Sequence, residues 1–178
     1  ILLYNSDIVP VGADQKQHVE FARDIAAYFN KIYGNIFKMP EPVIGAETGL
    51  IPGLDGRKMS KSYDNTIPLL CPTAELKKKI MRIITDSKTP EESKNPDEST
   101  IFQLYKFFAN TDEISTFRKR FLDGGMGYGE AKTILFEKMD SVLKPHREKY
   151  EHLMANTSEI DTVLNTGAER ARVVAKKV

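Results

Sequence analysis

The order of strand-like and helix-like patterns along the chain constrains its fold more than any other feature. One strand–turn–helix unit lies near the start, where Ile8-Val9-Pro10-Val11 indicates a short strand and residues 15–33 repeat apolar side chains at helical spacing. From Ser99 onward every segment has a helical pattern. One strand–helix unit cannot form a doubly wound sheet by itself. We therefore expect a mostly α chain with a small α/β part, and further sequence before Ile1.

The turn between this strand and this helix is Gly12-Ala13-Asp14-Gln15. At such turns α/β proteins present backbone N–H groups to nucleotides. The spacing leaves two roles open for Asp14. It favours a helix N-cap, the ordinary role of an aspartate there, over a carboxylate that accepts hydrogen bonds from ribose hydroxyls. The sequence shows no metal-ligand spacing, so we predict no protein metal site.

A basic loop follows in the middle of the chain. The stretch Asp55-Gly-Arg-Lys-Met-Ser-Lys-Ser62 gathers Arg57, Lys58 and Lys61 around small hydroxyl residues. Asp55-Gly56 favours a turn rather than a helix or strand. Ammonium groups neutralise a polyphosphate, and serine hydroxyls hydrogen-bond to it. The pattern is typical of a phosphate-binding loop, although a solvated basic turn has the same composition.

Composition excludes several classes of protein. The 178 residues carry 26 basic and 25 acidic side chains, a net charge of +1, so nucleic acid would have to bind through local patches. The single cysteine, Cys71, cannot form an internal disulfide, which fits a reducing, cytoplasmic setting. No apolar run approaches the roughly 20 residues that span a bilayer, so we expect no membrane association.

The helical part has several predicted boundaries. We expect Thr73 to cap one helix and Thr111 or Asp112 to cap another. A long helix over residues 130–154 should bend near Pro145. The glycine-rich stretch Gly124–Gly129 has no preceding strand, so an interhelical turn is a better interpretation than a phosphate cradle.

The last helical segment, Ser158–Val178, should be divided at Gly167. Four basic residues give its end a positively charged surface: Arg170, Arg172, Lys176 and Lys177. On a nearly neutral protein, this surface is a local patch of the kind through which nucleic acid would have to bind.

Two strings together resemble a known family. Val9-Pro-Val-Gly-Ala-Asp-Gln-Lys-Gln-His18 and Lys58-Met-Ser-Lys-Ser62 are similar to motifs of bacterial tryptophanyl-tRNA synthetases, which are class I enzymes. Gly125-Met-Gly-Tyr-Gly-Glu-Ala-Lys132 and Gly167-Ala-Glu-Arg-Ala171 also match, so the resemblance covers essentially the whole chain. Tyrosyl-tRNA synthetases share such a turn and loop, but their turn does not usually continue as Lys-Gln-His. A tyrosyl enzyme and a noncatalytic tRNA-binding relative remain alternatives.

The resemblance implies two domains and a set of site residues. Residues 1–72 would be the C-terminal part of a Rossmann-like catalytic domain, and residues 73–178 an α-helical anticodon-binding domain. Tryptophan would contact three residues: Val9, Val11 and Gln15. ATP would contact nine: Gly12, Ala13, Asp14, Ile51, Lys58, Met59, Ser60, Lys61 and Ser62. Lys58 and Lys61 would act in catalysis.

The resemblance also implies the reaction and the partners. A homodimeric, cytoplasmic tryptophan–tRNA ligase would use ATP, with Mg²⁺ bound to it, to make tryptophanyl adenylate and would charge tRNA(Trp). The chain has no His-Ile-Gly-His-like signature, which helps such enzymes to hold the ATP phosphates. The aspartate that contacts the indole N–H in this family would fall before Ile1. We therefore expect these 178 residues alone to be inactive.

Overall fold

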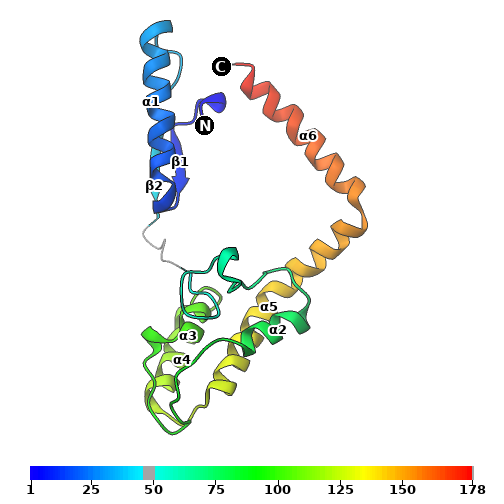
Figure 1. The fold of residues 1–178 in the computed structure, drawn as a ribbon. Helices are drawn as coiled ribbons and strands as arrows, with labels where there is room; N and C mark the ends of the chain where they lie inside the picture. The colour runs from blue at the N-terminus through cyan, green and yellow to red at the C-terminus, as the bar shows by residue number, and fades with distance from the viewer. Residues whose placement is uncertain (46–50, 178) are drawn as a thin grey trace. The chain divides into compact units, whose positions relative to one another are not determined.

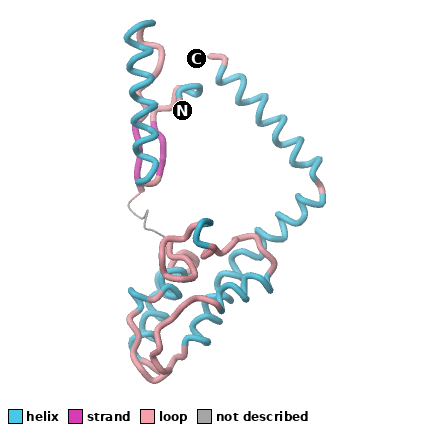
Figure 2. Tube along the Cα trace, in the orientation of Figure 1, coloured by secondary structure: helices cyan, strands magenta, loops and turns pink. Residues whose placement is uncertain are grey.

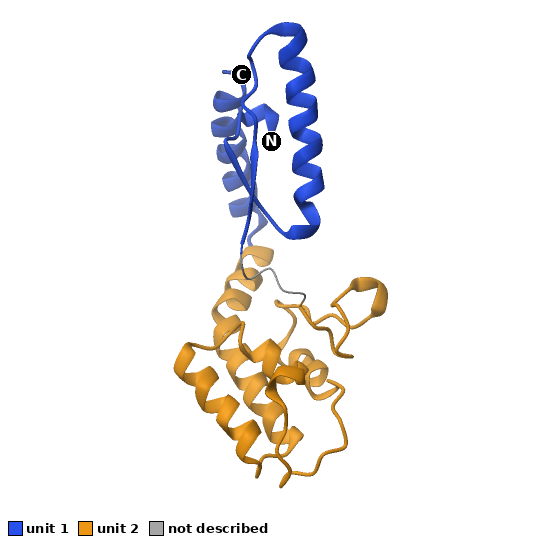
Figure 3. Cartoon of the chain, turned by 90° about the vertical axis from the view of Figure 1, so that its left-hand side faces the viewer, with its two compact units in different colours: residues 1–49, 156–178 blue, residues 50–155 orange. Residues whose placement is uncertain are grey.

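The structure, a computed structural model, describes residues 1–45 and 51–177. The chain divides into two compact units (Figure 3). The first comprises Ile1–Gly49 and Asn156–Val178, and the second comprises Leu50–Ala155. These units describe how the chain packs on itself. The functional domains 1–72 and 73–178 stay a prediction.

The first unit is built on a strand–helix–strand crossover, and its helix and strands are labelled in Figure 1. Strand β1 (Ile8–Val11) leads into α1 (Lys16–Tyr33), and the chain returns as β2 (Glu41–Ile44), parallel to β1. Val9 lies opposite Pro42 in the register, and Val11 lies opposite Ile44. Figure 2 shows the two strands beside the helix. The predicted strand, helix and small α/β part are thus confirmed.

Two polar side chains of α1 fasten the loop that leads to β2. The side-chain amide of Asn30 donates a hydrogen bond to the carbonyl of Phe37 at 2.7 Å, and its oxygen accepts one from the Phe37 amide at 2.9 Å. Arg23 donates to the carbonyl of Pro40 at 2.8 Å. These bonds satisfy loop groups that no strand pairs with, and they set where β2 begins.

The first unit also contains the C-terminal helix α6 (Thr157–Ala175). It lies against a short 3₁₀ helix, η1 (Leu2–Tyr4), near the start of the chain. The prediction that Gly167 divides this segment is wrong, because α6 passes through Gly167 without a break. A single helical glycine costs only about 1 kcal/mol relative to alanine, which a helix of 19 residues tolerates.

The second unit is helical around one apolar core. The α-helices described in it are α2 (Thr73–Met81), α3 (Thr100–Tyr105), α4 (Thr111–Asp123) and α5 (Tyr128–Ala155). Helix α5 packs against α2 and α3. Phe102, Phe117 and Phe121 form a buried aromatic group with ring centroids 5.0 to 6.0 Å apart. The second unit therefore has a core of its own, to which Leu54, Ile67 and Cys71 before α2 also contribute. Within the described ranges, no helix is long and apolar enough to cross a membrane.

A polar cluster around the buried Arg147 connects the start of α2 to α5. Arg147, only 5% exposed, donates hydrogen bonds to the Thr73 hydroxyl at 2.6 Å and to Asp140 at 3.0 Å. The Thr73 hydroxyl in turn donates to Asp140 at 3.1 Å. The prediction of Thr73 as an N-cap is wrong, because its hydroxyl has these partners and Pro72 occupies the cap position.

Helix α4 begins with a capping box at Asn110. The Asn110 side chain accepts a hydrogen bond from the Glu113 amide at 2.9 Å, and the Glu113 carboxylate accepts one from the Asn110 amide at 2.8 Å. The predicted caps, Thr111 and Asp112, are therefore wrong. Asparagine caps at least as well as threonine, and the glutamate three residues later completes the reciprocal pair.

The glycine-rich break connects α4 to α5, as predicted. Gly124 and Gly125 have φ values of 75° and 79°, in the left-handed region that favours glycine. A Cβ on Gly124 would lie 2.4 Å from the carbonyl oxygen of Glu91. The loop before α3 therefore passes directly over this turn.

Candidate nucleotide site

The turn after β1 places candidate ATP ligands at the carboxyl end of a parallel strand, the usual place for ligands in α/β proteins. Gly12 is extended, and Ala13–Gln15 form the 3₁₀ helix η2, which leads into α1. Gln15 occupies the N-cap position of α1, so the interpretation of Asp14 as the cap is wrong. Asp14 is exposed, and a Cβ on Gly12 would lie only 2.7 Å from its carboxylate. The Asp14 carboxylate thus lies beside the turn, where a ligand can reach it.

The candidate tryptophan ligands lie in the same short segment. Val9 and Val11 are half-buried on one face of β1, while Ile8 and Pro10 are exposed on the other. The side-chain oxygen of Gln15 lies 2.6 Å from Nδ1 of His18 on the next helical turn. The structure brings Val9, Val11 and Gln15 to one strand end, and their binding of tryptophan stays a prediction.

The basic loop begins in the turn of a small hairpin in the second unit and continues beyond the hairpin. The Met59 amide donates to the carbonyl of Ile51 at 2.8 Å, and the Gly53 amide donates to the carbonyl of Arg57 at 2.7 Å. Between these bonds Pro52 and Lys58 form an antiparallel bridge. Residues Lys58–Ser62, called the lysine loop below, leave this hairpin toward solvent. Its two lysine side chains are exposed, as a phosphate-binding role requires.

The middle of the lysine loop shapes the backbone. Met59 is half-buried against the core of the second unit. Ser60 Oγ accepts a hydrogen bond from the Ser62 amide at 3.2 Å and caps the 3₁₀ helix η3 (Lys61–Tyr63). The Ser60 hydroxyl proton can still be donated. Lys61 and Ser62 are exposed at the start of η3, so both can face an anion.

Arg57 is engaged within the protein. Its guanidinium pairs with the Asp55 carboxylate at 2.6 Å and lies 4.7 Å from the centroid of the Tyr63 ring. The pKa of Asp55 is held below its ordinary value, first by a hydrogen bond from Asn65; burial opposes this shift, and the contacts with Arg57 add to it. Asp55 is therefore ionised at neutral pH and partly neutralises Arg57. The lysines are the cations that the loop presents to a ligand.

An apolar hollow of about 540 Å³ adjoins the lysine loop. Its lining is Ile51, Met59, Lys61, Thr66, Ile67, Pro68, Leu69, Leu104, Phe107, Phe108 and Met139. Ile51, the candidate adenine contact, is 46% exposed here. The hollow thus combines an apolar wall with one ammonium group, and the contact of Ile51 with adenine stays a prediction.

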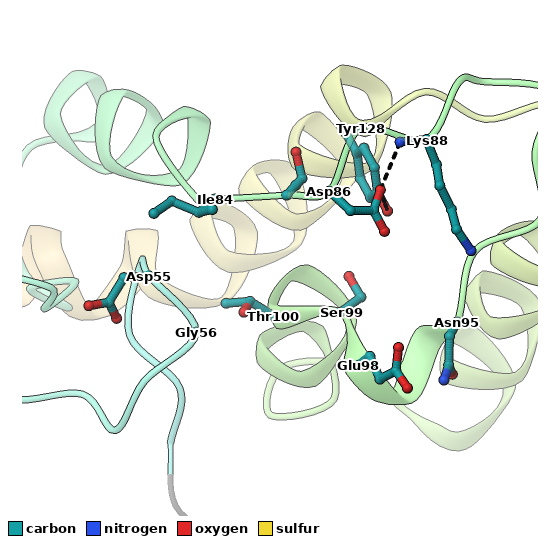
Figure 4. Close-up of a pocket in the computed structure, with 11 residues that line it drawn as sticks. Asp55, Gly56, Ile84, Asp86, Lys88, Asn95, Glu98, Ser99, Thr100 and Tyr128 are labelled. Carbon is teal, nitrogen blue, oxygen red and sulfur yellow. Dashed lines mark hydrogen bonds between the residues drawn. The ribbon is translucent and has the colours of Figure 1, made fainter.

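A second, polar hollow of about 410 Å³ is lined in part by Asp55 and Gly56 of the hairpin turn (Figure 4). Asp86 accepts hydrogen bonds from the Tyr128 hydroxyl at 2.8 Å and from the Lys88 amide at 3.0 Å. These bonds lower the pKa of Asp86, the one from Lys88 having the larger effect. Burial, and then the bond to Asp86, raise the pKa of Tyr128. Sequence reasoning missed this hollow because its residues come from separate segments.

The candidate residues fall into three groups within the two units. The Gly12–Gln15 turn and the basic C-terminal residues belong to the first unit, and the lysine loop belongs to the second. Four exposed basic residues lie at the end of α6 and just beyond it: Arg170, Arg172, Lys176 and Lys177. The structure brings residues together within each group. The binding of ATP by the Gly12–Gln15 turn and by the lysine loop stays a prediction.

The parallel strand that ends in a Gly-x-Asp-Gln turn and the Lys-Met-Ser-Lys-Ser loop are the two features on which the resemblance to class I synthetases rests. A family model described as "tRNA synthetases class I (W and Y)" matches residues 1–144. The chain belongs to this family. Membership of this family confirms the resemblance found in the sequence. It also confirms the predicted fold class.

Individual relatives agree with this assignment. The chain is 49% identical over 178 residues to a tryptophan–tRNA ligase of Pseudomonas aeruginosa, covering 98% of this chain and 40% of that protein. It is 47% identical over 176 residues to one of Fusobacterium nucleatum, covering 98% and 54%. A crystal structure of Campylobacter jejuni tryptophanyl-tRNA synthetase, complexed with ADP and tryptophan, superposes with a TM-score of 0.89 at 42% identity, covering 99% and 56%. The chain thus spans about half the length of these relatives.

Proposed function

We propose that this chain acts within a tryptophan–tRNA ligase. In that role it supplies the phosphate-binding lysine loop, one side of the tryptophan site and helices that bind tRNA(Trp). The observation that carries the proposal is its 49% identity, over nearly its whole length, to a protein of that name. The similar synthetase structure from Campylobacter jejuni is complexed with ADP and tryptophan, which supports the proposal that this chain contacts a nucleotide and tryptophan.

The proposed reaction has two steps. The carboxylate of tryptophan attacks the α-phosphate of ATP, forming tryptophanyl adenylate and releasing pyrophosphate. A hydroxyl of the terminal ribose of tRNA(Trp) then attacks the activated carbonyl and releases AMP. Neither step needs a nucleophile from the protein. Catalysis consists of positioning and of stabilising the charge that develops on the leaving pyrophosphate.

Different residues of the chain bind the phosphates, the ribose and the amino acid. Exposed Lys58 and Lys61 neutralise the phosphates, and the bound Mg²⁺ arrives as part of the ATP substrate. The amides of Gly12 and Ala13 approach ATP, and Asp14 accepts hydrogen bonds from its ribose. On the amino-acid side, Gln15 contacts the head group of tryptophan, beside the apolar face that β1 presents to the indole ring.

The proposal extends to partners and setting. The basic end of α6 attracts tRNA(Trp) through its phosphates, which position a nucleic acid without reading its sequence. The family resemblance implies a homodimer in the cytoplasm. Adenine is held against the apolar wall that includes Ile51 and Met59.

A chimeric enzyme tests the proposal. Residues 1–178 replace the matching segment of the Pseudomonas aeruginosa ligase, and the product is called the chimeric enzyme below. We expect pyrophosphate exchange into ATP that depends on tryptophan, and charging of tRNA(Trp). Exchange that depends on tyrosine instead would support a tyrosyl enzyme. Binding of tRNA without any exchange, by a chimera that circular dichroism shows to be folded, would overturn the catalytic function.

A further inference from the structure

Asn65 lies three residues after the lysine loop and is 2% exposed. Its side chain makes three hydrogen bonds. The oxygen accepts one from the Ser60 amide at 2.8 Å. The nitrogen donates to the carbonyl of Lys58 at 3.1 Å and to the carboxylate of Asp55 at 2.7 Å. A buried amide with all three bonds made is strongly fixed in place, because each broken bond would leave a buried group without a partner.

These bonds hold the backbone on both sides of Met59. The hairpin ladder ends at the bond between the Met59 amide and Ile51. Beyond that point the Asn65 side chain fixes the carbonyl of Lys58 and the amide of Ser60. The direction in which the chain carries Lys58 and Lys61 is therefore set by one amide group beneath the loop.

The hairpin is built around this amide. The Leu54 amide donates to the backbone carbonyl of Asn65 at 3.0 Å. A Cβ on Gly53 would lie 2.3 Å from both Cγ and Nδ2 of the Asn65 side chain. Only glycine lets the strand pass so close to the buried amide. Two consecutive residues of the hairpin, Gly53 and Leu54, thus accommodate one asparagine.

We propose that Asn65 is the positioning residue of the lysine loop, holding Lys58 and Lys61 in the geometry that adenylate formation requires. This inference rests on the proposed function. Asn65 is buried beneath the loop, so it acts through the backbone and not by contact with ATP. Charges that are held in place before the reaction stabilise a transition state without reorganising. A small displacement of such groups can cost about 100-fold in rate.

The Asn65→Asp variant tests the role with little change of volume. It keeps an acceptor for the Ser60 amide, removes both N–H donors and places a second carboxylate beside Asp55. In the chimeric enzyme we expect kcat for tryptophan-dependent exchange to fall about 10- to 100-fold, with KM for tryptophan within about twofold. In the 178-residue chain, hydrogen exchange of the Met59 and Ser60 amides should accelerate at least about 10-fold, while α5 amides stay protected.

Two further variants separate positioning from general damage. Asn95→Asp is the matched control, because Asn95 caps a 3₁₀ helix at Pro96–Glu98 in the same unit and aspartate caps equally well. In Asn95→Asp, kcat and the hydrogen-exchange protection of the Met59 and Ser60 amides should equal those of the protein with unchanged Asn95. The double variant Asp55→Asn with Asn65→Asp restores a donor–acceptor pair between positions 55 and 65. Its kcat should recover part of the loss seen in Asn65→Asp.

Each result decides between the possibilities. Unchanged kcat and unchanged loop protection in Asn65→Asp would overturn the proposal. Faster exchange of loop and α5 amides together would also overturn it, because Asn65 would then be a general stabilising residue. If the chimeric enzyme with unchanged Asn65 shows no tryptophan-dependent exchange while Asn65→Asp still loosens only the loop, Asn65 shapes the loop and the proposed function fails.

Discussion

Lys58 and Lys61 present their charges on a loop whose backbone is anchored by the two residues between them. Met59 is half-buried against the core, and Ser60 caps the short helix that begins at Lys61. The two exposed lysines thus stand on ordered backbone, so little reorganisation is needed when a triphosphate binds. The effect of each lysine on the rate of adenylate formation can therefore be tested by its own substitution.

At the scale of one residue, Lys61→Ala should slow adenylate formation in the chimeric enzyme. The Lys61 ammonium group should meet charge that develops on the leaving pyrophosphate, so its effect belongs mainly to the transition state. We expect the single-turnover rate to fall on the order of 10²–10³-fold, with little change in tryptophan affinity. Rapid-quench measurement of tryptophanyl adenylate checks this expectation.

Lys119→Ala is the matched control, because Lys119 is an exposed lysine of α4. It removes one positive charge from the same unit without touching the lysine loop. A normal adenylation rate for Lys61→Ala, or an equal loss in Lys119→Ala, would remove Lys61 from the mechanism.

Roles of single residues were the hardest to predict from the sequence. The lysine loop could be found because its residues are contiguous and chemically distinctive. Asn65 gave no signal, since its partners become neighbours only when the hairpin closes. Thr73 was mistaken for a cap because its hydroxyl partner, Arg147, lies 74 residues away. Local patterns cannot reveal hydrogen bonds that folding creates between distant segments.

At the scale of one element, the start of α4 offers a direct comparison of two caps. Asn110→Ala removes the side chain that accepts from the Glu113 amide, and it should cost about 0.5–2 kcal/mol of unfolding free energy. Thr111→Ala removes the residue that the sequence favoured, and it should change stability by less than about 0.5 kcal/mol. Urea denaturation of the 178-residue chain, followed by far-ultraviolet circular dichroism, measures both. A larger loss in Thr111→Ala would contradict the capping box.

The end of α6 forms the second element-scale test. Alanine at all four basic positions (Arg170, Arg172, Lys176 and Lys177) should weaken tRNA binding by the chimeric enzyme and leave exchange of pyrophosphate into ATP unchanged. Each lost phosphate contact should reduce the slope of log affinity against log salt by about 0.7–0.9. Binding titrations across a salt series measure this slope. Unchanged affinity and slope would show that this surface does not contact tRNA.

Elements were easier to predict than residues. Periodicity predicted α1 and α6 almost to their ends, because each repeats apolar residues at helical spacing over many turns. The break predicted at Gly167 is absent from α6, since one helical glycine costs only about 1 kcal/mol in a helix of 19 residues. The proline- and glycine-rich stretch 34–57 favours an irregular loop with short strand pieces at Val43-Ile44 and Leu50-Ile51. Val43-Ile44 belongs to β2, whereas Leu50 lies outside the described residues.

At the scale of the whole chain, α1 carries an apolar stripe that the described residues leave exposed. Phe21, Ile25, Tyr28 and Ile32 recur at helical spacing and are between 53% and 69% exposed. Contiguous apolar surface of this kind favours association. We expect the 178-residue chain to self-associate as its concentration rises, and Ile25→Glu to reduce this. Sedimentation velocity measures both, with the exposed α4 variant Lys119→Glu as the control. A chain that stays monomeric at all concentrations would contradict the expectation.

The 178-residue chain alone should not make tryptophanyl adenylate. Its lysine loop and its Gly12–Gln15 turn supply two groups of ligands, but its histidines are His18, His146 and His152, and none belongs to a His-Ile-Gly-His-like signature. The phosphates would therefore be held by the lysine loop without the second phosphate-binding group that the family resemblance implies. Transition-state stabilisation depends on preorganised donors aimed at the positions where charge develops, and each missing donor lowers the rate.

The deciding assay is pyrophosphate exchange into ATP by the purified chain, with and without tryptophan, beside the chimeric enzyme as positive control. We expect no exchange above background from the chain and clear exchange from the chimera. Circular dichroism and the protection of α5 amides establish that the chain is folded under the assay conditions. Tryptophan-dependent exchange by the chain alone would mean that residues 1–178 hold a complete site. The Gly12–Gln15 turn and the lysine loop would then be sufficient to activate tryptophan.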